Sequence, residues 1–137
     1  MKTFLGILLA SSAATCALMN VESFAQEPGR WKFVSMGSDG TVVSIDTRTI
    51  EQSDGVSTAW VQYVYPGDYG KYVNGQSVVK ALQREEIHCR VMQSAVLSYA
   101  AYNKTGEGVF SSTPPSATFT PIVPDSVAEA VWRELCR

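Results

Sequence analysis

His88 is the residue best suited to acid–base or ligand chemistry, because it is the only histidine of the chain and stands between Glu86 and Arg90. A histidine here could ligate a haem iron or a metal ion, or it could be a solvated surface side chain. A metal site would need carboxylates from distant parts of the chain, since no second histidine exists. We therefore predict no metal site and no cofactor, and a ligand role for His88 stays an open alternative.

No group of residues has the pattern of an enzyme active site. A nucleophilic enzyme needs a nucleophile, a base and an orienting group, and the chain has no Gly-x-Ser-x-Gly motif. Glu85 and Glu86 are neighbours, so in a strand they would point to opposite faces and form a poor acid–base pair. The glycine-rich stretches lie in predicted turns, which argues against a phosphate-binding loop. The sequence thus predicts a protein that is not an enzyme.

Residues 1–25 have the organisation of a secretory signal peptide. Lys2 precedes an apolar run, and small residues occupy the positions before a cut after Ala25. Cleavage there would leave residues 26–137 as one exported domain, and a lipoprotein signal that uses Cys16 is the alternative. The apolar run is too short to cross a bilayer as a helix, so we predict no membrane span.

The cysteines agree with export. Cleavage would remove Cys16 and leave Cys89 and Cys136, and an even pair in an exported domain predicts a disulfide. The bridge would enclose about 48 residues and, in the loop-entropy description, stabilise the domain by about 4 kcal/mol. Two buried free thiols are the alternative interpretation.

Composition narrows the class of partner. The net charge is -2, which gives no electrostatic basis for nucleic-acid binding. The hydrophobic fraction of 45% is normal for a globular domain, so we expect a packed core rather than disorder.

Hydrophobic periodicity predicts an α+β fold, with a mainly antiparallel sheet of about five to six strands packed on one C-terminal α-helix. Strands are expected over 31–36, 41–46, 56–65 and 108–112. Period-two alternation from Ile87 to Ala101 predicts a single long strand with one buried face. The alternation fails upstream, so we expect a bend or bulge at 83–86.

The C-terminal helix has a clear beginning in the sequence. Ser126, followed three residues later by Glu129, forms a capping box. Apolar residues at helical spacing continue to about Cys136, so the helix should lie on the sheet, with Cys136 bridged to Cys89 near its end.

Two groups of residues are candidates for binding. Tyr69 and Tyr72 lie in a glycine-rich loop, and exposed tyrosines suit protein contacts because they give a large contact area at low entropic cost. The second group is a modest basic strip made of Lys80, Arg84, His88 and Arg90. Core packing is the alternative for Trp60 and alternate tyrosines of the preceding strand, whereas Tyr69 and Tyr72 have no obvious core role. An ordinary solvated sheet face is the alternative for the strip.

Several elements of the chain, in order, resemble the surface-adhesin protein E-like domain family of Gram-negative bacteria. They are Val43–Asp46 with Ile50, Ile87–Arg90, Leu97–Tyr99 leading to Tyr102–Gly106, and Pro121–Glu129 closing on Cys136. The resemblance implies a small antiparallel sheet on a C-terminal helix, with the two cysteines bridged. It also implies an adhesin whose partners are host extracellular-matrix proteins.

The resemblance leaves location and partner open. The protein is expected in the periplasm or on the outer surface of a Gram-negative bacterium. The alternative to an adhesin is a periplasmic structural or interaction domain with a bacterial envelope protein as its partner. An exposed sheet edge would also allow a homodimer.

Overall fold

The computed structural model describes residues 28–67 and 71–137. Within them the predicted fold class is confirmed: the chain forms a mostly antiparallel sheet, one C-terminal helix and a Cys89–Cys136 disulfide. The main sheet has eight strands, which is more than the five to six expected from the sequence. The predicted signal peptide and Tyr69 lie outside the described residues.

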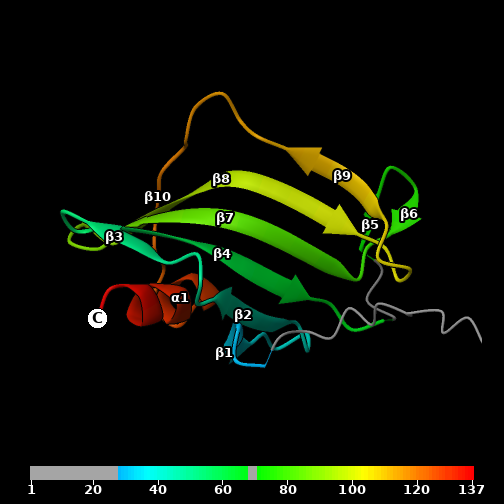
Figure 1. Cartoon of the computed structure of the whole chain (residues 1–137), viewed down its shortest axis with the longest axis horizontal. Helices are drawn as coiled ribbons and strands as arrows, with labels where there is room; N and C mark the ends of the chain where they lie inside the picture. Colours follow the sequence, from blue (N-terminus) through cyan, green and yellow to red (C-terminus); the bar gives the residue numbers. More distant parts are fainter. Residues whose placement is uncertain (1–27, 68–70) are drawn as a thin grey trace, which may run out of the picture.

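The described elements are β1 (Trp31–Met36), β2 (Val42–Asp46), β3 (Glu51–Ser53), β4 (Val56–Val64), β5 (Tyr72–Val73), β6 (Gln76–Ser77), β7 (Lys80–His88), β8 (Gln93–Tyr102), β9 (Gly108–Ser112), β10 (Thr120–Pro121) and α1 (Val127–Leu135). The main sheet follows the order β1-β2-β4-β7-β8-β10, with β3 beside β4 and β9 beside β8 (Figure 1). Strands β5 and β6 form a separate small hairpin within the stretch predicted to be a loop.

The prediction of a single long strand from Ile87 to Ala101 is wrong. Strand β7 ends at His88, the chain turns, and β8 starts at Gln93 and pairs antiparallel with β7. The turn has no glycine or proline, which are the usual sequence signals of a break. Instead Met92 takes the left-handed conformation, with φ of 50°. The alternation of apolar and polar residues continues across this turn, so the pattern gave no sign that the chain reverses direction here.

The bend or bulge predicted within 83–86 is wrong for β7 itself, which pairs with β4 in unbroken register and buries Ala81, Glu85 and Ile87 on one face. An irregularity does lie opposite this stretch, but it is on β8. The register between β7 and β8 shifts opposite Arg84 and Glu85, where Leu97 is the extra residue on β8. A bulge of this kind bends the strand and increases its local twist.

The core lies between the sheet and α1. Odd-numbered side chains of β2, β4 and β7 face the helix, and the buried cluster contains Val43, Ile45, Ala59, Val61, Ile87, Ile122, Val131 and Leu135. The helix contacts β1 and β4, so it covers one side of the sheet near that edge. The other side of the sheet carries no helix (Figure 1).

The predicted Ser126 cap is confirmed, while the Glu129 side chain reaches back to the residue before the cap instead of to Ser126 itself. The N–H of Glu129 donates to Ser126 Oγ at 3.2 Å, and the N–H of Asp125 donates to Glu129 Oε2 at 2.7 Å. Ser126 is the N-cap residue of α1, so the helix begins where the sequence indicated.

The disulfide joins the end of the helix to the turn after β7. The Cα atoms of Cys89 and Cys136 are 5.5 Å apart, which is a common separation for a disulfide. The Trp132 indole N–H also donates to the Cys89 carbonyl at 3.1 Å. Both links hold α1 against the hairpin formed by β7 and β8.

Candidate functional site

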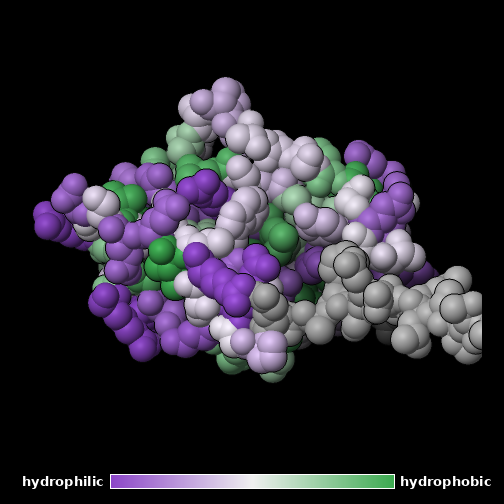
Figure 2. Space-filling model, in the orientation of Figure 1, coloured by the Kyte–Doolittle hydropathy of each residue, from purple (hydrophilic) through white to green (hydrophobic). Residues whose placement is uncertain are grey.

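The side of the sheet without a helix is the candidate binding surface, called here the helix-free face. Even-numbered residues of β4 and β7 point to it, because the odd-numbered ones face the core. Figure 2 shows a mixed surface in the orientation of Figure 1, with hydrophobic residues in green between hydrophilic ones in purple. A protein interface as a whole is about as apolar as the rest of the surface, so this mixture is compatible with binding but does not mark it.

Two adjoining hollows lie on this face. The first has a volume of about 280 Å³ and is lined by Arg30, Trp31, Asp46, Thr49, Trp60, Leu82, Ala100 and Tyr102. The second has about 270 Å³ and is lined by Ala100, Tyr102, Gly108, Val109, Phe110 and Ser111. Trp31 of β1 and Tyr102 of β8 are separated by three strands in the sheet order, yet both line the first hollow. The helix-free face is therefore concave.

An ion pair between buried Asp46 and partly exposed Arg30 forms one end of the first hollow. Asp46 is 1% exposed, and its Oδ2 accepts hydrogen bonds from Arg30 Nε at 3.0 Å and from a second guanidinium nitrogen at 2.8 Å. The other oxygen, Oδ1, accepts from the Arg48 backbone N–H at 3.1 Å. The Arg30 guanidinium also lies 5.7 Å from the centre of the Trp31 ring. Asp46 thus fixes Arg30 and Trp31 at the rim of the hollow.

The structure places three residues of the predicted basic strip together on the helix-free face. Lys80, Arg84 and His88 are all on β7 at even-numbered positions, so their side chains share one side of the strand. Lys80 Nζ lies 4.8 Å from the centre of the Tyr102 ring, at the edge of the hollows. The strip therefore borders the aromatic hollow rather than forming a separate surface.

Acidic neighbours offset much of the charge of the strip. An Arg84 guanidinium nitrogen is 3.6 Å from an oxygen of Glu51. His88 Nε2 is 2.8 Å from Glu86 Oε1, and the His88 ring lies 4.2 Å from that of Phe119. The helix-free face is consequently polar and aromatic, with only a small excess of positive charge.

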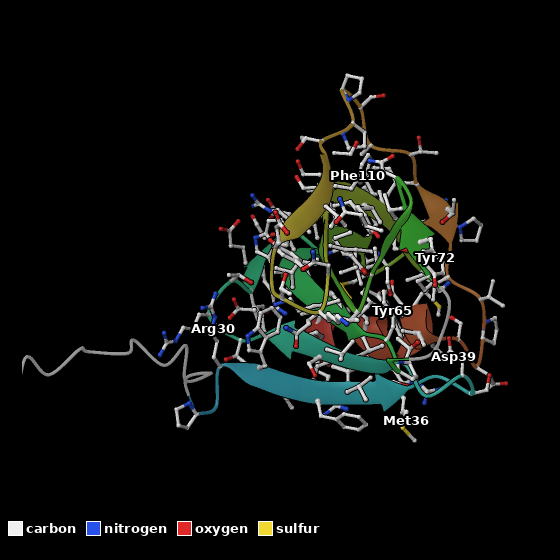
Figure 3. The ribbon with its side chains drawn as sticks, turned by 90° about the vertical axis from the view of Figure 1, so that its right-hand side faces the viewer. Arg30, Met36, Asp39, Tyr65, Tyr72 and Phe110 are labelled. Carbon is white, nitrogen blue, oxygen red and sulfur yellow. A yellow bond between two sulfur atoms is a disulfide. The ribbon has the colours of Figure 1, made fainter. Side chains whose placement is uncertain are left out.

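The remaining predicted site residues lie elsewhere. Arg90 is in the turn after β7, with its side chain beside Gly55, and so does not extend the strip along the strand. Tyr72 is 67% exposed on β5 and lines neither hollow. Figure 3 shows Tyr72 and Asp39 on one side of the molecule and Arg30 on the other. Tyr72 therefore lies on the opposite side of the molecule from the Arg30 end of the first hollow.

Sequence reasoning missed the residues that form the walls of the hollow. Trp60 had a usable signal, because it alternates with the apolar Ala59 and Val61 of β4. Leu82 had none, because the odd positions beside it in β7 include Gln83 and Glu85. Trp31 and Tyr102 had none, since their approach depends on the curvature of the sheet. Nothing local in the sequence indicated that Asp46 would be buried.

Within residues 28–67 and 71–137, no three side chains of the His, Cys, Asp or Glu type gather closely enough to hold a metal ion. Over the same residues, no helix has the length and apolar character needed to cross a membrane.

The fold has solved counterparts. The crystal structure of Haemophilus influenzae protein E has a TM-score of 0.54 at 12% identity, over 79% of this chain and 84% of that one. A second crystal form gives a TM-score of 0.57 at 12% identity, over 79% and 87% of the two chains. Protein E from a non-typeable strain gives 0.54 at 12% identity, over 79% and 76%. At this identity the likeness concerns the fold.

The sequence itself shows the family. Residues 31–137 match the family described as Surface-adhesin protein E, so the chain belongs to that family. The match covers nearly the whole described part, including the helix-free face and the disulfide. No curated protein matches the sequence. The chain is therefore a surface adhesin-type protein, in agreement with the resemblance stated above.

Proposed function

We propose that this protein is an exported, non-enzymatic binding module whose helix-free face contacts a protein partner. Host extracellular-matrix proteins are the partner class that we favour, because the chain belongs to a family of surface adhesins. A bacterial envelope protein is the alternative partner. The proposal depends mainly on one observation, which is the concave hollow bounded by Trp31, Trp60 and Tyr102.

The chemistry of the hollow supports this choice. Tryptophan, tyrosine and arginine are enriched among the residues that dominate binding energy at protein interfaces. Arg30 is already held in place by Asp46, so little of its side-chain entropy remains to be lost on binding. Lys80, Arg84 and His88 would form a polar rim beside this aromatic centre. Arg90 and the loop tyrosines Tyr69 and Tyr72 would contribute separate, peripheral contacts.

Export is part of the same proposal. Residues 1–25 would direct secretion and be removed, leaving residues 26–137 as the mature domain. Protease treatment of intact cells, with a periplasmic protein as the control, distinguishes the two locations. Cleavage would place the protein on the cell surface and favour an adhesin. Protection would favour a periplasmic domain with an envelope partner.

The binding face is tested by the substitution Ala100→Glu. Ala100 lines both hollows, so a glutamate there would fill them and add a carboxylate to the aromatic centre. Ala117→Glu is the matched control, because it makes the same change on an exposed segment between β9 and β10. Binding to an immobilised basement-membrane preparation should fall about tenfold or more for Ala100→Glu and stay unchanged for Ala117→Glu. Equal binding by both variants would contradict the helix-free face as the binding surface.

A further inference from the structure

A pocket on the opposite side of the sheet contains an unusual acid. The pocket has a volume of about 440 Å³ and lies beside the start of α1, between β4, β7, β8 and the segment that leads to β10, with Ala128 of α1 in its lining. That segment runs from β9 over the edge of the sheet toward the helix (Figure 1). Glu85 of β7 lines the pocket and is only 5% exposed.

Glu85 has one hydrogen-bond partner in the described part of the chain. The Tyr63 hydroxyl of β4 donates to Glu85 Oε1 at 2.7 Å. Among the described residues, Glu85 Oε2 accepts no hydrogen bond. No lysine, arginine or histidine lines the pocket, so the carboxyl group has no cation beside it. A carboxylate in such surroundings is costly unless an opposite charge pairs with it.

The rest of the pocket suits a particular shape of ligand. Hydroxyl and amide groups of Gln83, Ser94 and Thr118 add further oxygen acceptors. Val96 and Pro114 add apolar surface. A primary ammonium group carries three donors and no acceptor, and an alkyl stem packs well against apolar side chains.

We propose that this pocket binds an alkylammonium group, which pairs with the free oxygen of Glu85 while its alkyl stem packs against Val96 and Pro114. Two sources share this chemistry: a lysine side chain of a protein partner and a free small amine. The pocket lies across the sheet from the helix-free face, because Glu85 occupies an odd-numbered position of β7. The inference is therefore independent of the proposed function.

The test uses the purified protein and three small probes, followed by NMR titration of backbone amide signals. The probes are n-butylammonium, blocked lysine (Nα-acetyl-lysine N-methylamide) and its neutral counterpart blocked norleucine. Both ammonium probes should shift the signals of Ser94 and Thr118 in a saturable way, and blocked norleucine should not. This contrast is measured on the unaltered protein, so it does not depend on the folding of a variant.

Variants then assign the effect to one carboxyl group. Glu85→Gln keeps the size of the side chain and removes the charge, so ammonium binding should weaken about tenfold or more. Glu86→Gln is the matched control, because Glu86 is adjacent on β7 but points to the helix-free face and pairs with His88. Its ammonium binding should equal that of the unaltered protein.

The results of these titrations distinguish a partner's lysine side chain from a free small amine, and some results would overturn the proposal. Tighter binding of blocked lysine than of n-butylammonium would support a partner's lysine side chain, and equal binding would support a free amine. Saturable binding of blocked norleucine with equal affinity would overturn the proposal. So would undiminished ammonium binding by Glu85→Gln, or unshifted Ser94 and Thr118 signals at the highest ammonium concentration.

Discussion

The Tyr63 hydroxyl donates a hydrogen bond of 2.7 Å to Glu85 across the neighbouring strands β4 and β7. Burial raises the pKa of the Glu85 carboxyl group above its ordinary value, and the Tyr63 hydrogen bond lowers it by a smaller amount. Burial and the nearby Glu85 also raise the pKa of Tyr63, so Tyr63 remains the donor. The fold thus contains an acid that is more readily protonated than an exposed glutamate.

Glu85 should make the protein less stable as the pH rises. Its pKa is higher in the folded protein than the ordinary 4.5, so above about pH 4.5 the folded state binds more protons than the unfolded state. The contribution of Glu85 to the free energy of unfolding is therefore greatest below the unfolded pKa and declines as pH rises through the folded pKa. Tyr63 is the other titratable group lining the pocket, and its pKa lies far above this range.

Glu85→Gln should remove this pH dependence. We expect the variant to be more stable than the unaltered protein at neutral pH, because a neutral amide avoids burial of a charge and still accepts the Tyr63 hydrogen bond. Urea denaturation midpoints at acidic and neutral pH measure the difference. Glu86→Gln serves as the control, since Glu86 faces the other side. A Glu85→Gln variant that is less stable at neutral pH would contradict a buried, unpaired carboxylate.

Cys136→Ser should lower the melting temperature and leave Cys89 as a free, reactive thiol. The disulfide closes a sequence separation of 47 residues, for which loop entropy predicts a loss of about 4 kcal/mol, with smaller measured values common. Thermal unfolding and thiol labelling under oxidising conditions measure both effects. The double variant Cys89→Ser/Cys136→Ser separates loss of the bridge from reactions of the free thiol. An unchanged melting temperature in both variants would rule out a stabilising bridge.

Ser126→Ala should destabilise the protein by about 1 kcal/mol, because it removes the oxygen that caps the first turn of α1. Ser126 Oγ accepts from the Glu129 N–H at 3.2 Å and donates to the Val123 carbonyl at 2.6 Å, so both links would be lost. Chemical denaturation measures the change. Ser112→Ala, an exposed change at the end of β9, should have almost no effect. Equal effects of the two substitutions would argue against the capping role.

Sequence alone specified the elements whose signals are local. Strand β1 has the predicted bounds, and α1 begins after the capping serine because the Ser126 and Glu129 side chains satisfy backbone groups within one turn of themselves. The disulfide also followed from sequence, since two cysteines in an expected exported domain have only each other as partners. The strand and the helix start depend on residue types at short spacing. The disulfide depends on there being only one possible pair of cysteines.

Tertiary structure decided the features on which both candidate sites depend. The sequence placed Glu85 and Glu86 on opposite faces of a strand but did not say which face is buried. The pairing of β7 between β4 and β8, with α1 on one side, buries Glu85 and leaves Glu86 beside His88. The turn after His88 has no glycine or proline, and the alternation of apolar and polar residues continues across it. Only the antiparallel pairing of β7 with β8 shows that the chain turns there. The curvature of the sheet brings Trp31 to the same hollow as Tyr102. These outcomes depend on contacts between residues that are far apart in the chain, so they cannot be predicted from any short segment of the sequence.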